Sequence, residues 1–413
     1  MSNYNINTIC YILNNFPEPS ETFISNEAEA MLDLGVTPYI FSLGEGEMSL
    51  LHPSAKKALD FNLLTKITNK SKKQSLKYIC RLFLMHPRNT IFALFKAFRS
   101  RYRWIYFQAA YYAFMLLNMK VQFIHAHFAD ANLRWAKVLS DWTGIPFGVT
   151  THRYDILDDP IPVNEASQLY AKANLIISIS KYNKCLMTQK YNLSPDKIKI
   201  IHCGIDTTRF KPHQSLVKFN DRKLKFINIG RLVPQKGQDI VLRALAEVKE
   251  RGVQFEMQII GCGHLKNDLS DLAKSMGIDD CVHFAGAQNQ EVVIEMLNKA
   301  DIFILSSRSE GLPIVCMEAM SMEVFLIATR IFGIPELVSD RENGLLVEPE
   351  DVQGLADAIC WADKNRGALK TMTINARKKV EKHFNRNSCI SMLYREMNIA
   401  VNAHLKKSKF LMC

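Results

Sequence analysis

The clearest absence in this chain of 413 residues is any paired cysteine motif. Its ten cysteines are scattered singly from Cys10 to Cys413, and no two have the two-residue spacing of a zinc site or a redox motif. Scattered cysteines are typical of a reduced, cytosolic protein. The first sixteen residues also lack the basic start, apolar core and cleavage site of a secretory signal, so we expect no export.

Long apolar runs and low-complexity tracts are missing as well. In the most apolar region the longest uncharged run covers residues 104–119, whereas a transmembrane helix needs about 20 residues. With 48% hydrophobic and 23% charged residues, the chain is expected to be globular. Its length exceeds what one hydrophobic core usually supports, which predicts two domains of roughly 150 to 200 residues each.

Acidic residues are absent between residues 61 and 129, although the net charge of the whole chain is only +11. The basic residues of this segment are Lys66, Lys70, Lys72, Lys73, Lys77, Arg81, Arg88, Lys96, Arg99, Arg101, Arg103 and Lys120. Aromatic residues are interleaved with them, and we take Phe92, Phe95, Phe98, Trp104 and Tyr106 as interfacial anchors. The pattern favours a surface that lies on an anionic membrane. The alternatives are a solvated basic face over a helical core and a nucleic-acid surface, but no recognition motif supports the latter, and we expect no nucleic-acid partner.

Short β-branched runs alternate with helical patterns along the whole chain, which predicts parallel sheets. Strands are expected at 8–13, 38–43, 123–128, 147–152, 175–180 and 198–204, and again at 224–230, 255–261, 282–286, 302–307 and 325–329. Helices are expected at 237–250, 264–276, 289–300 and 313–322. We predict an α/β protein with two doubly wound, Rossmann-like domains facing a central cleft. The first covers 1–205, a linker 206–223 leads to the second at 224–380, and 381–413 forms a helix that packs back across both.

Three loops of the second half directly follow predicted strands, where a doubly wound sheet binds its ligands. "NIGRLVPQKGQD" supplies Arg231 and Lys236, "IIGCGH" supplies Gly261 and Gly263, and "SSRSEGLPIV" supplies Glu310 ahead of a helix with Pro313 in its first turn. Two cations beside a helix N-terminus are typical of a diphosphate site. Each element alone has a plainer interpretation, as a tight turn or a solvated charge.

Two carboxylates, Glu310 and Glu318, lie in an otherwise small and apolar stretch. Glu318 belongs to the apolar helix "PIVCMEAM", where a buried carboxylate needs a polar partner such as a sugar or ribose hydroxyl. Residues eight apart, one in a loop and one in a helix, give no sign of the facing carboxyl pair of a glycosidase. We therefore interpret them as a clamp on a ligand.

Two histidines, His125 and His127, occur in "HAHF". We interpret their alternation along the strand as placing them on opposite sides, which favours a packed or loop-facing pair over a shared metal. No metal site is predicted anywhere in the chain.

The second half resembles the C-terminal domain of glycosyltransferase family 4, retaining enzymes of the GT-B fold. "GRLVPQKGQDIVLRAL", "EGLPIVCMEAM", "GIPELV", "NGLLVEPED" and "LADAI" occur in the family's order. In the first half, "FPEPSETFISNE", "HAHFADANLRWAKVLSDWTGIPFGVTTHRYDI" and "HCGIDTTRFKP" resemble the colanic-acid-type transferases that build bacterial exopolysaccharides. This resemblance carries most of the functional expectation.

The resemblance implies a role for each residue of the site. Arg231 and Lys236 would bind the diphosphate of the donor and stabilise the leaving nucleotide, and Glu318 would accept from the ribose hydroxyls. The donor sugar would be held by Glu310, by the N–H groups of Gly311 and Leu312, and by His152, with Asp155 organising the loop of His152. The remaining substrate-binding positions are Gly261, Gly263, Ala287 beside the base, Pro313, and Glu21 in a loop that reaches into the cleft.

The chain departs from the family pattern at a few positions. Glu323 and Phe325 stand where a Gly and a Pro are usual, and Phe332 replaces the first of two glycines, which bears on donor choice. A glycine-rich first loop is replaced by "NNFPEPSE". No Asp-x-Asp is present to bind a metal on the sugar nucleotide, so the resemblance implies a metal-independent reaction without a cofactor, in which two cations and a helix dipole replace the metal.

The expected protein is a retaining hexosyltransferase that moves a sugar from a nucleoside diphosphate sugar to a glycan acceptor. A lipid-linked acceptor and a place on the inner face of the cytoplasmic membrane fit the basic segment and a role in exopolysaccharide or lipopolysaccharide synthesis. The alternatives are a catalytically silent scaffold that binds a nucleotide sugar on the membrane and, among enzymes, a non-hydrolysing sugar-nucleotide epimerase.

Overall fold

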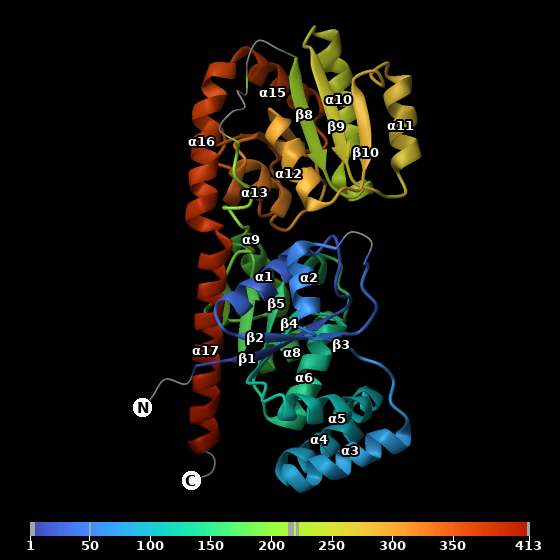
Figure 1. The fold of residues 1–413 in the computed structure, drawn as a ribbon, viewed down its shortest axis with the longest axis vertical. Helices are drawn as coiled ribbons and strands as arrows, with labels where there is room; N and C mark the ends of the chain where they lie inside the picture. The colour runs from blue at the N-terminus through green and yellow to red at the C-terminus, as the bar shows by residue number, and fades with distance from the viewer. Residues whose placement is uncertain (1–4, 49–50, 214–218, 220–222, 411–413) are drawn as a thin grey trace. The chain divides into compact units, whose positions relative to one another are not determined.

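The computed structural model describes residues 5–48, 51–213, 219 and 223–410 (Figure 1). The chain forms two compact units, one of Met1–Ile201 with Ile390–Cys413 and one of His202–Cys389. The predicted linker at 206–223 lies partly outside the described residues. Its described residues up to 213 belong to the second unit, where Phe210 is buried and Ile205 pairs with Asn385.

The first unit is built on a seven-stranded parallel sheet in the order β3-β2-β1-β4-β5-β6-β7. Its strands are β1 (Thr8–Leu13), β2 (Thr37–Ser42), β3 (Leu64–Lys66), β4 (Phe123–His127), β5 (Phe147–Thr151), β6 (Leu175–Ser178) and β7 (Ile198–Ile200). Its helices are α1 (Thr22–Asp33), α2 (Pro53–Asp60), α3 (Lys72–Met85), α4 (Pro87–Arg99), α5 (Arg103–Asn118), α6 (Ala131–Thr143), α7 (Arg153–Leu157), α8 (Val163–Lys172) and α9 (Lys181–Tyr191), with the 3-10 turn η1 (Pro195–Lys197). Strands β4 and β5 are buried along their whole length, as expected of parallel strands that are covered by helices.

The second unit contains a six-stranded parallel sheet in the order β10-β9-β8-β11-β12-β13. Its strands are β8 (Leu224–Ile229), β9 (Phe255–Ile260), β10 (Val282–Gly286), β11 (Ile302–Leu305), β12 (Phe325–Thr329) and β13 (Leu345–Val347). Its helices are α10 (Gln238–Glu250), α11 (Lys266–Ser275), α12 (Gln290–Lys299), α13 (Ile314–Ser321), α14 (Ile334–Leu337), α15 (Val352–Lys364) and α16 (Arg366–His383), with the 3-10 turn η2 (Pro234–Lys236). Helix α17 (Arg386–Phe410) starts in this unit and continues in the first from Ile390.

Each sheet has one point at which the strand order reverses direction. In the first unit it lies between β1 and β4, and in the second between β8 and β11, which pair directly. Loops leaving the carboxyl ends of the two strands diverge there, which makes this point the usual ligand site of a doubly wound sheet. The predicted α/β architecture is confirmed, and the loops that follow these strands are the place to look for chemistry.

Helix α4 is amphipathic in the reverse sense to an ordinary surface helix. Its buried residues are the small Thr90, Ala93 and Ala97, which pack on the core. Four of its large apolar residues, Ile91, Phe92, Phe95 and Phe98, are exposed, Phe98 by 77%, whereas Leu94 is partly buried against the core. A helix of a globular protein normally turns its large apolar side chains inward, so this face is available to a partner.

The helices that contact α4, α3 and α5, expose further large apolar residues. Among the described residues, nine of the nineteen exposed large hydrophobic side chains fall between 76 and 104: Leu76, Phe83, Leu84, Met85, Ile91, Phe92, Phe95, Phe98 and Trp104. We call these nine residues the α3–α5 apolar face. Tyr106 does not belong to it, because its ring is buried and its hydroxyl donates to Asp141 at 2.7 Å, so its prediction as an anchor was wrong.

Candidate functional site

The loops after β8 and β9 are held together by close backbone contact. Leu232 N–H donates to the carbonyl of Cys262 at 2.8 Å, and Gly261 and Gly263 both have left-handed backbones, with φ of 142° and 158°. A side chain at Gly261 would place its Cβ 1.9 Å from the carbonyl oxygen of Gly230, and one at Gly263 would lie 2.2 Å from that of Leu232. The "GCG" motif is therefore required by packing, because only glycine allows two backbones to approach this closely.

A second set of bonds joins the loop after β8 to the loop after β11, and Arg308 lies at its centre. Its guanidinium donates to both carboxylate oxygens of Asp239 at 2.8 Å and to the carbonyl of Pro234 at 2.8 Å. It also donates to Glu350 at 3.0 Å. These partners raise the pKa of Arg308 further above its ordinary value, chiefly through the bond to Asp239. Bidentate pairs of this kind fix orientation as well as distance, and Arg308 thereby positions the segment that contains Lys236.

The predicted cation Lys236 and the predicted carboxylate Glu310 meet at this sheet edge. Lys236 Nζ lies 2.7 Å from Glu310 Oε1, and Ser307 Oγ donates to the same oxygen at 2.7 Å. Arg231 is exposed, and no described residue forms an ion pair or hydrogen bond with its guanidinium. The edge thus presents one paired and one unpaired cation.

Glu318 is the most unusual carboxylate of the second unit. It lies on α13 and is only 8% exposed. No described residue donates a hydrogen bond to its side chain. Burial raises the pKa of Glu318 to about 7. A buried carboxylate without a partner costs folding free energy, so its presence in a core helix needs a functional explanation.

The remaining second-unit residues of the prediction surround these groups. Pro313 is the N-cap of α13 and does not lie in its first turn, while Leu312 is buried and Gly311 is half-buried just before it. Ala287 is exposed in the loop after β10, where Gln288 donates to the carbonyl of Ala285 at 2.6 Å. The loops after β8, β9, β10 and β11 therefore supply all of the predicted second-unit residues that lie outside α13.

In the first unit His152 is the N-cap of α7, directly after β5, and is buried. Its ring centroid lies 4.6 Å from those of Phe23 and Phe128. Burial, followed by the charge of His127, holds the pKa of His152 well below its usual range, so the ring is neutral at pH 7. Glu21 is the N-cap residue of α1 and makes no side-chain capping bond.

Asp155 connects two segments at this sheet edge. Its carboxylate accepts from the backbone N–H of His152 at 2.6 Å and from that of Ala129 at 2.9 Å. Burial raises the pKa of Asp155 to about 8, although the backbone donors oppose the shift. The side chain joins the loop after β4 to the start of α7 and so orients His152.

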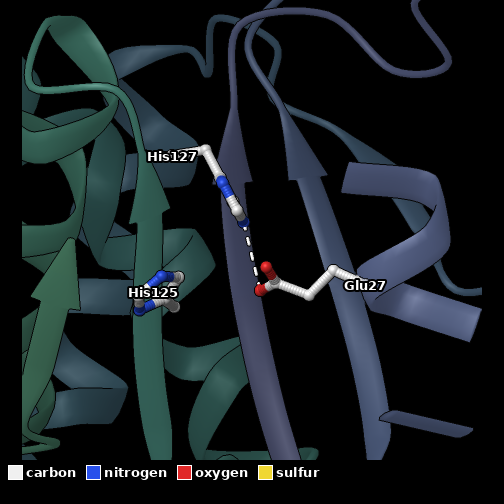
Figure 2. A group of neighbouring side chains, drawn as sticks. All are labelled: Glu27, His125 and His127. Carbon is white, nitrogen blue, oxygen red and sulfur yellow. Dashed lines mark ion pairs between the residues drawn. The ribbon is translucent and has the colours of Figure 1, made fainter. Parts of the chain in front are cut away.

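The two histidines of "HAHF" lie on the same side of β4 (Figure 2). Their ring centroids are 5.3 Å apart, and His127 Nε2 is 3.3 Å from Glu27 Oε1. The prediction of opposite sides was wrong, because residues two apart on a strand share a face. His127 Nδ1 also lies 3.4 Å from His152 Nε2, which connects the pair to the predicted sugar-binding histidine.

Comparison with known proteins matches both halves of the chain to glycosyltransferase families. Residues 20–209 match the model "Glycosyltransferase Family 4" and residues 211–379 match "Glycosyl transferases group 1". The putative colanic acid biosynthesis glycosyltransferase WcaL of Escherichia coli K12 is 29% identical over 396 residues, or 91% of this chain and 95% of that protein. The amylovoran biosynthesis glycosyltransferase AmsK of Erwinia amylovora is 27% identical over 90% of this chain and 94% of its own.

The chain is a family 4 glycosyltransferase.

Solved structures agree on its fold. The Anabaena protein HepE in complex with UDP has a TM-score of 0.74 at 17% identity, covering 94% of this chain and 99% of its own. A glycosyltransferase of Rickettsia africae has a TM-score of 0.73 at 20% identity over 95% of this chain and 99% of its own. These likenesses identify the fold of the glycosyltransferase as GT-B.

Two of the departures from the family pattern occupy strained backbone. Glu323, after α13, and Phe332, before α14, have φ of 54° and 45°, in the left-handed region that favours glycine. At both positions the family usually has glycine, so the family preference has a backbone cause. The glycosyltransferase tolerates side chains there at a cost in strain.

A cavity of about 310 Å³ lies elsewhere in the first unit of the glycosyltransferase, between α5, α6 and α8. Several basic residues line it, but its carboxylate Glu165 is bound by Arg101 and by Arg134, whose Nη2 lies 3.0 Å away. Lys137, at its wall, pairs with Asp141. These charges are largely paired within the protein, so we assign the cavity no ligand. No helix among the described residues is both long and apolar enough to cross a membrane.

Proposed function

We propose that this glycosyltransferase moves a sugar, with retention of anomeric configuration, from a nucleoside diphosphate sugar to a lipid-linked glycan at an anionic membrane surface. The observation that carries the proposal is Glu318, a buried carboxylate on α13 to which no described residue donates a hydrogen bond. Ribose hydroxyls would supply its missing donors, and a diphosphate would supply the counter-charge for Arg231. HepE was solved with UDP-glucose and with UDP and glucose, which supports a donor of this class.

The proposed reaction uses binding and charge stabilisation in place of a carboxylate nucleophile. Glu310 is engaged by Lys236 and Ser307, which suits an acceptor for sugar hydroxyls better than a general acid. Lys236 and Arg231 would neutralise charge that develops on the departing diphosphate, so no metal is needed at that position. Gly311 and Leu312 would present their N–H groups to the sugar, and His152 would contact it from the first unit. Retention would be read from the anomeric coupling of the product by NMR.

The function is tested with a panel of nucleoside diphosphate sugars in a thermal-shift assay. A ligand present at a hundred times its Kd stabilises the folded state by about 2.7 kcal/mol, so the cognate donor will stand out. The response should disappear in Arg231→Ala and persist in Arg243→Ala, an exposed arginine on α10. Stabilisation by no nucleotide at all would contradict the proposal.

Activity assays then separate the alternatives. Transfer of label from the donor to an extracted lipid-linked glycan supports the proposal. Binding without any turnover would identify a silent scaffold, and conversion of the donor without an acceptor would identify an epimerase.

The membrane part of the proposal, on the inner face of the cytoplasmic membrane, rests on the α3–α5 apolar face and on the lysines beside it. Lys72, Lys73 and Lys77 are exposed on α3, and no described carboxylate pairs with them. Each lysine near an anionic surface contributes about 1 kcal/mol, while exposed Phe95 and Phe98 would enter the headgroup layer. Large apolar side chains and positive charge on the same surface fit lipid better than either protein or water.

Co-sedimentation with vesicles tests this docking. Binding should rise with the fraction of anionic lipid and fall with salt. It should drop at least tenfold in Lys72/Lys73/Lys77→Glu and in Phe95/Phe98→Ala. The matched control, Lys364/Lys370/Lys378→Glu, changes the net charge equally in the second unit and should bind normally. Equal losses of vesicle binding in the control and the α3 variant would mean that binding depends only on the net charge of the protein.

A further inference from the structure

The side chains at the switch point of the first sheet include three potential metal ligands. Glu27 on α1 and His125 and His127 on β4 each offer one atom, and these three atoms lie within 4.8 Å of one another (Figure 2). His125 and His127 are fully buried, and the Glu27 side chain is 12% exposed. No other group of this kind is found among the described residues.

The atoms that face one another lack hydrogen-bond partners. His125 Nδ1, His127 Nε2 and Glu27 Oε1 are all buried without a hydrogen bond of acceptable geometry. His127 Nε2 and Glu27 Oε1 are 3.3 Å apart, close enough to pair but poorly aligned to do so. Buried polar atoms are nearly always satisfied, so three that face one another point to a missing ligand.

The opposite nitrogen of each imidazole is already engaged. His125 Nε2 lies 2.8 Å from Thr150 Oγ1, and His127 Nδ1 lies 3.4 Å from His152 Nε2. Metal-binding histidines usually have this arrangement, in which a second partner fixes the ring and its tautomer. Tyr11 also lies at this site, with its ring centroid 5.4 Å from that of His127, and its hydroxyl is a further buried atom without a hydrogen bond of acceptable geometry.

We propose that Glu27, His125 and His127 bind a divalent transition-metal ion of the zinc class. Two imidazoles and one carboxylate are a common ligand set for Zn²⁺, with a fourth position for water. Bond lengths near 2.1 Å place tetrahedral ligands about 3.4 Å apart. The pair of Glu27 and His127, 3.3 Å apart, already meets that spacing, and a shift of at most about 1.4 Å brings in His125.

The ion would have two consequences within the first unit. It would cross-link α1 to β4, because one ligand comes from the helix and two from the strand. It would also occupy His127 Nε2, so that His127 Nδ1 must hold the proton and donate to His152 Nε2. The metal would thus fix the tautomer of His152 through His127, without contacting the diphosphate.

Zinc binding by the full-length chain is measured by calorimetry and thermal shift, without donor or acceptor, so its outcome is independent of the proposed function. One equivalent of Zn²⁺ should bind and raise the Tm. Glu27→Gln and His127→Gln should each weaken binding at least tenfold, whereas His264→Ala, at an exposed loop histidine, should bind as the parent does. Circular dichroism and the Tm in EDTA establish that the variants are folded.

Cobalt substitution identifies the ligands. Co²⁺ held by nitrogen and oxygen gives visible bands without the near-ultraviolet charge-transfer band of a thiolate. Exposed cysteines such as Cys80 and Cys185 make that distinction necessary. A thiolate band, Zn²⁺ binding unchanged in both variants, or no saturable binding would each overturn the proposal.

Discussion

The two sheets of this glycosyltransferase share the strand order 3-2-1-4-5-6, which β7 extends in the first sheet, yet their switch points differ in chemistry. At the second, between β8 and β11, the side chains are a lysine, an arginine and glutamates, held by ion pairs and backbone contacts. At the first, between β1 and β4, they are imidazoles in aromatic surroundings, with a carboxylate on α1. The same topology therefore gathers cations and carboxylates at the switch point of one unit and buried imidazoles with one carboxylate at that of the other, and the difference lies in the residues that follow and cover the strands.

Removing the second-unit cations should have the largest effect. Arg231→Ala and Lys236→Ala are each expected to lower kcat by 10²- to 10³-fold, as lost donors to a developing anion do elsewhere. The Tm of Arg231→Ala should change little because Arg231 is exposed, whereas Lys236→Ala should lower the Tm because it leaves the buried Glu310 without its ion pair. His152→Ala should lower kcat while leaving nucleotide affinity intact. Steady-state kinetics measure kcat, and calorimetry measures nucleotide affinity. Turnover at the parent level in both cation variants would contradict the assignment of Arg231 and Lys236 to the diphosphate.

A side chain at the backbone contact of the second unit should destabilise it nearly as much. Gly261→Ala is expected to cost about 3 kcal/mol, since overpacking adds to the strain of a left-handed residue. Gly252→Ala is the matched control, because its φ is 83° but no atom lies within 4 Å of its added Cβ. It should cost about 1 kcal/mol. Chemical denaturation measures both, and equal costs would mean that the loops do not depend on close approach.

The unpartnered Glu318 predicts a pH effect that has a definite sign. Its pKa is about 7 in the folded protein against an ordinary value of 4.5, so the folded state holds the proton more tightly. Stability is therefore lost as pH rises from about 4.5 to 7 and stays reduced above that range. Glu318→Gln removes this penalty, which is on the order of 3 kcal/mol. The variant should have a higher Tm than the parent at pH 8 and a similar one at pH 5, and a constant difference would contradict the assigned shift.

The two glutamates should differ in what they bind, with effects of about tenfold. Glu318→Gln should weaken free nucleoside diphosphate and intact donor alike, because both contain the ribose. Glu310→Gln should weaken only the donor, since the free nucleotide lacks the transferred sugar and Lys236 is released to bind phosphate. Calorimetry with both ligands measures this. Equal losses of affinity for both ligands in both variants would contradict the interpretation of Glu310 and Glu318 as a clamp.

Much of the fold could be predicted because strong periodic patterns coincide with real elements. Strands β1, β10 and β12 have the predicted bounds, and most other strands differ at their ends by a few residues. The short β3 and β13 were missed, because three residues are too few to establish alternation. The reverse amphipathicity of α4 was also beyond reach, since a sequence shows which residues are apolar but not which face the core covers.

Within the candidate site, the residues after strands were predictable and their supports were not. The role of Arg308 was missed because its partners Asp239 and Glu350 are 69 and 42 residues away in the sequence. No local sequence pattern predicts such distant pairs. The cluster of Glu27, His125 and His127 was missed through the strand-face error and because Glu27 comes from a separate helix. Family motifs predicted Arg231, Lys236, Glu310 and Glu318 as site residues. The burial and the hydrogen-bond partners of these residues could be learned only from the structure.

Helix α17 has a consequence for how the protein is made. Asn398 accepts from the backbone N–H of Ile6 at 2.9 Å, and Tyr394 donates to the carbonyl of the same residue at 3.1 Å. Leu393, Met397 and Val401 of this helix are buried. The ribosome makes these residues only after the whole second unit, which is contiguous in the chain. Residues 202–389 can therefore fold while synthesis continues, whereas the first unit, although begun earlier, waits for α17 before its core is closed.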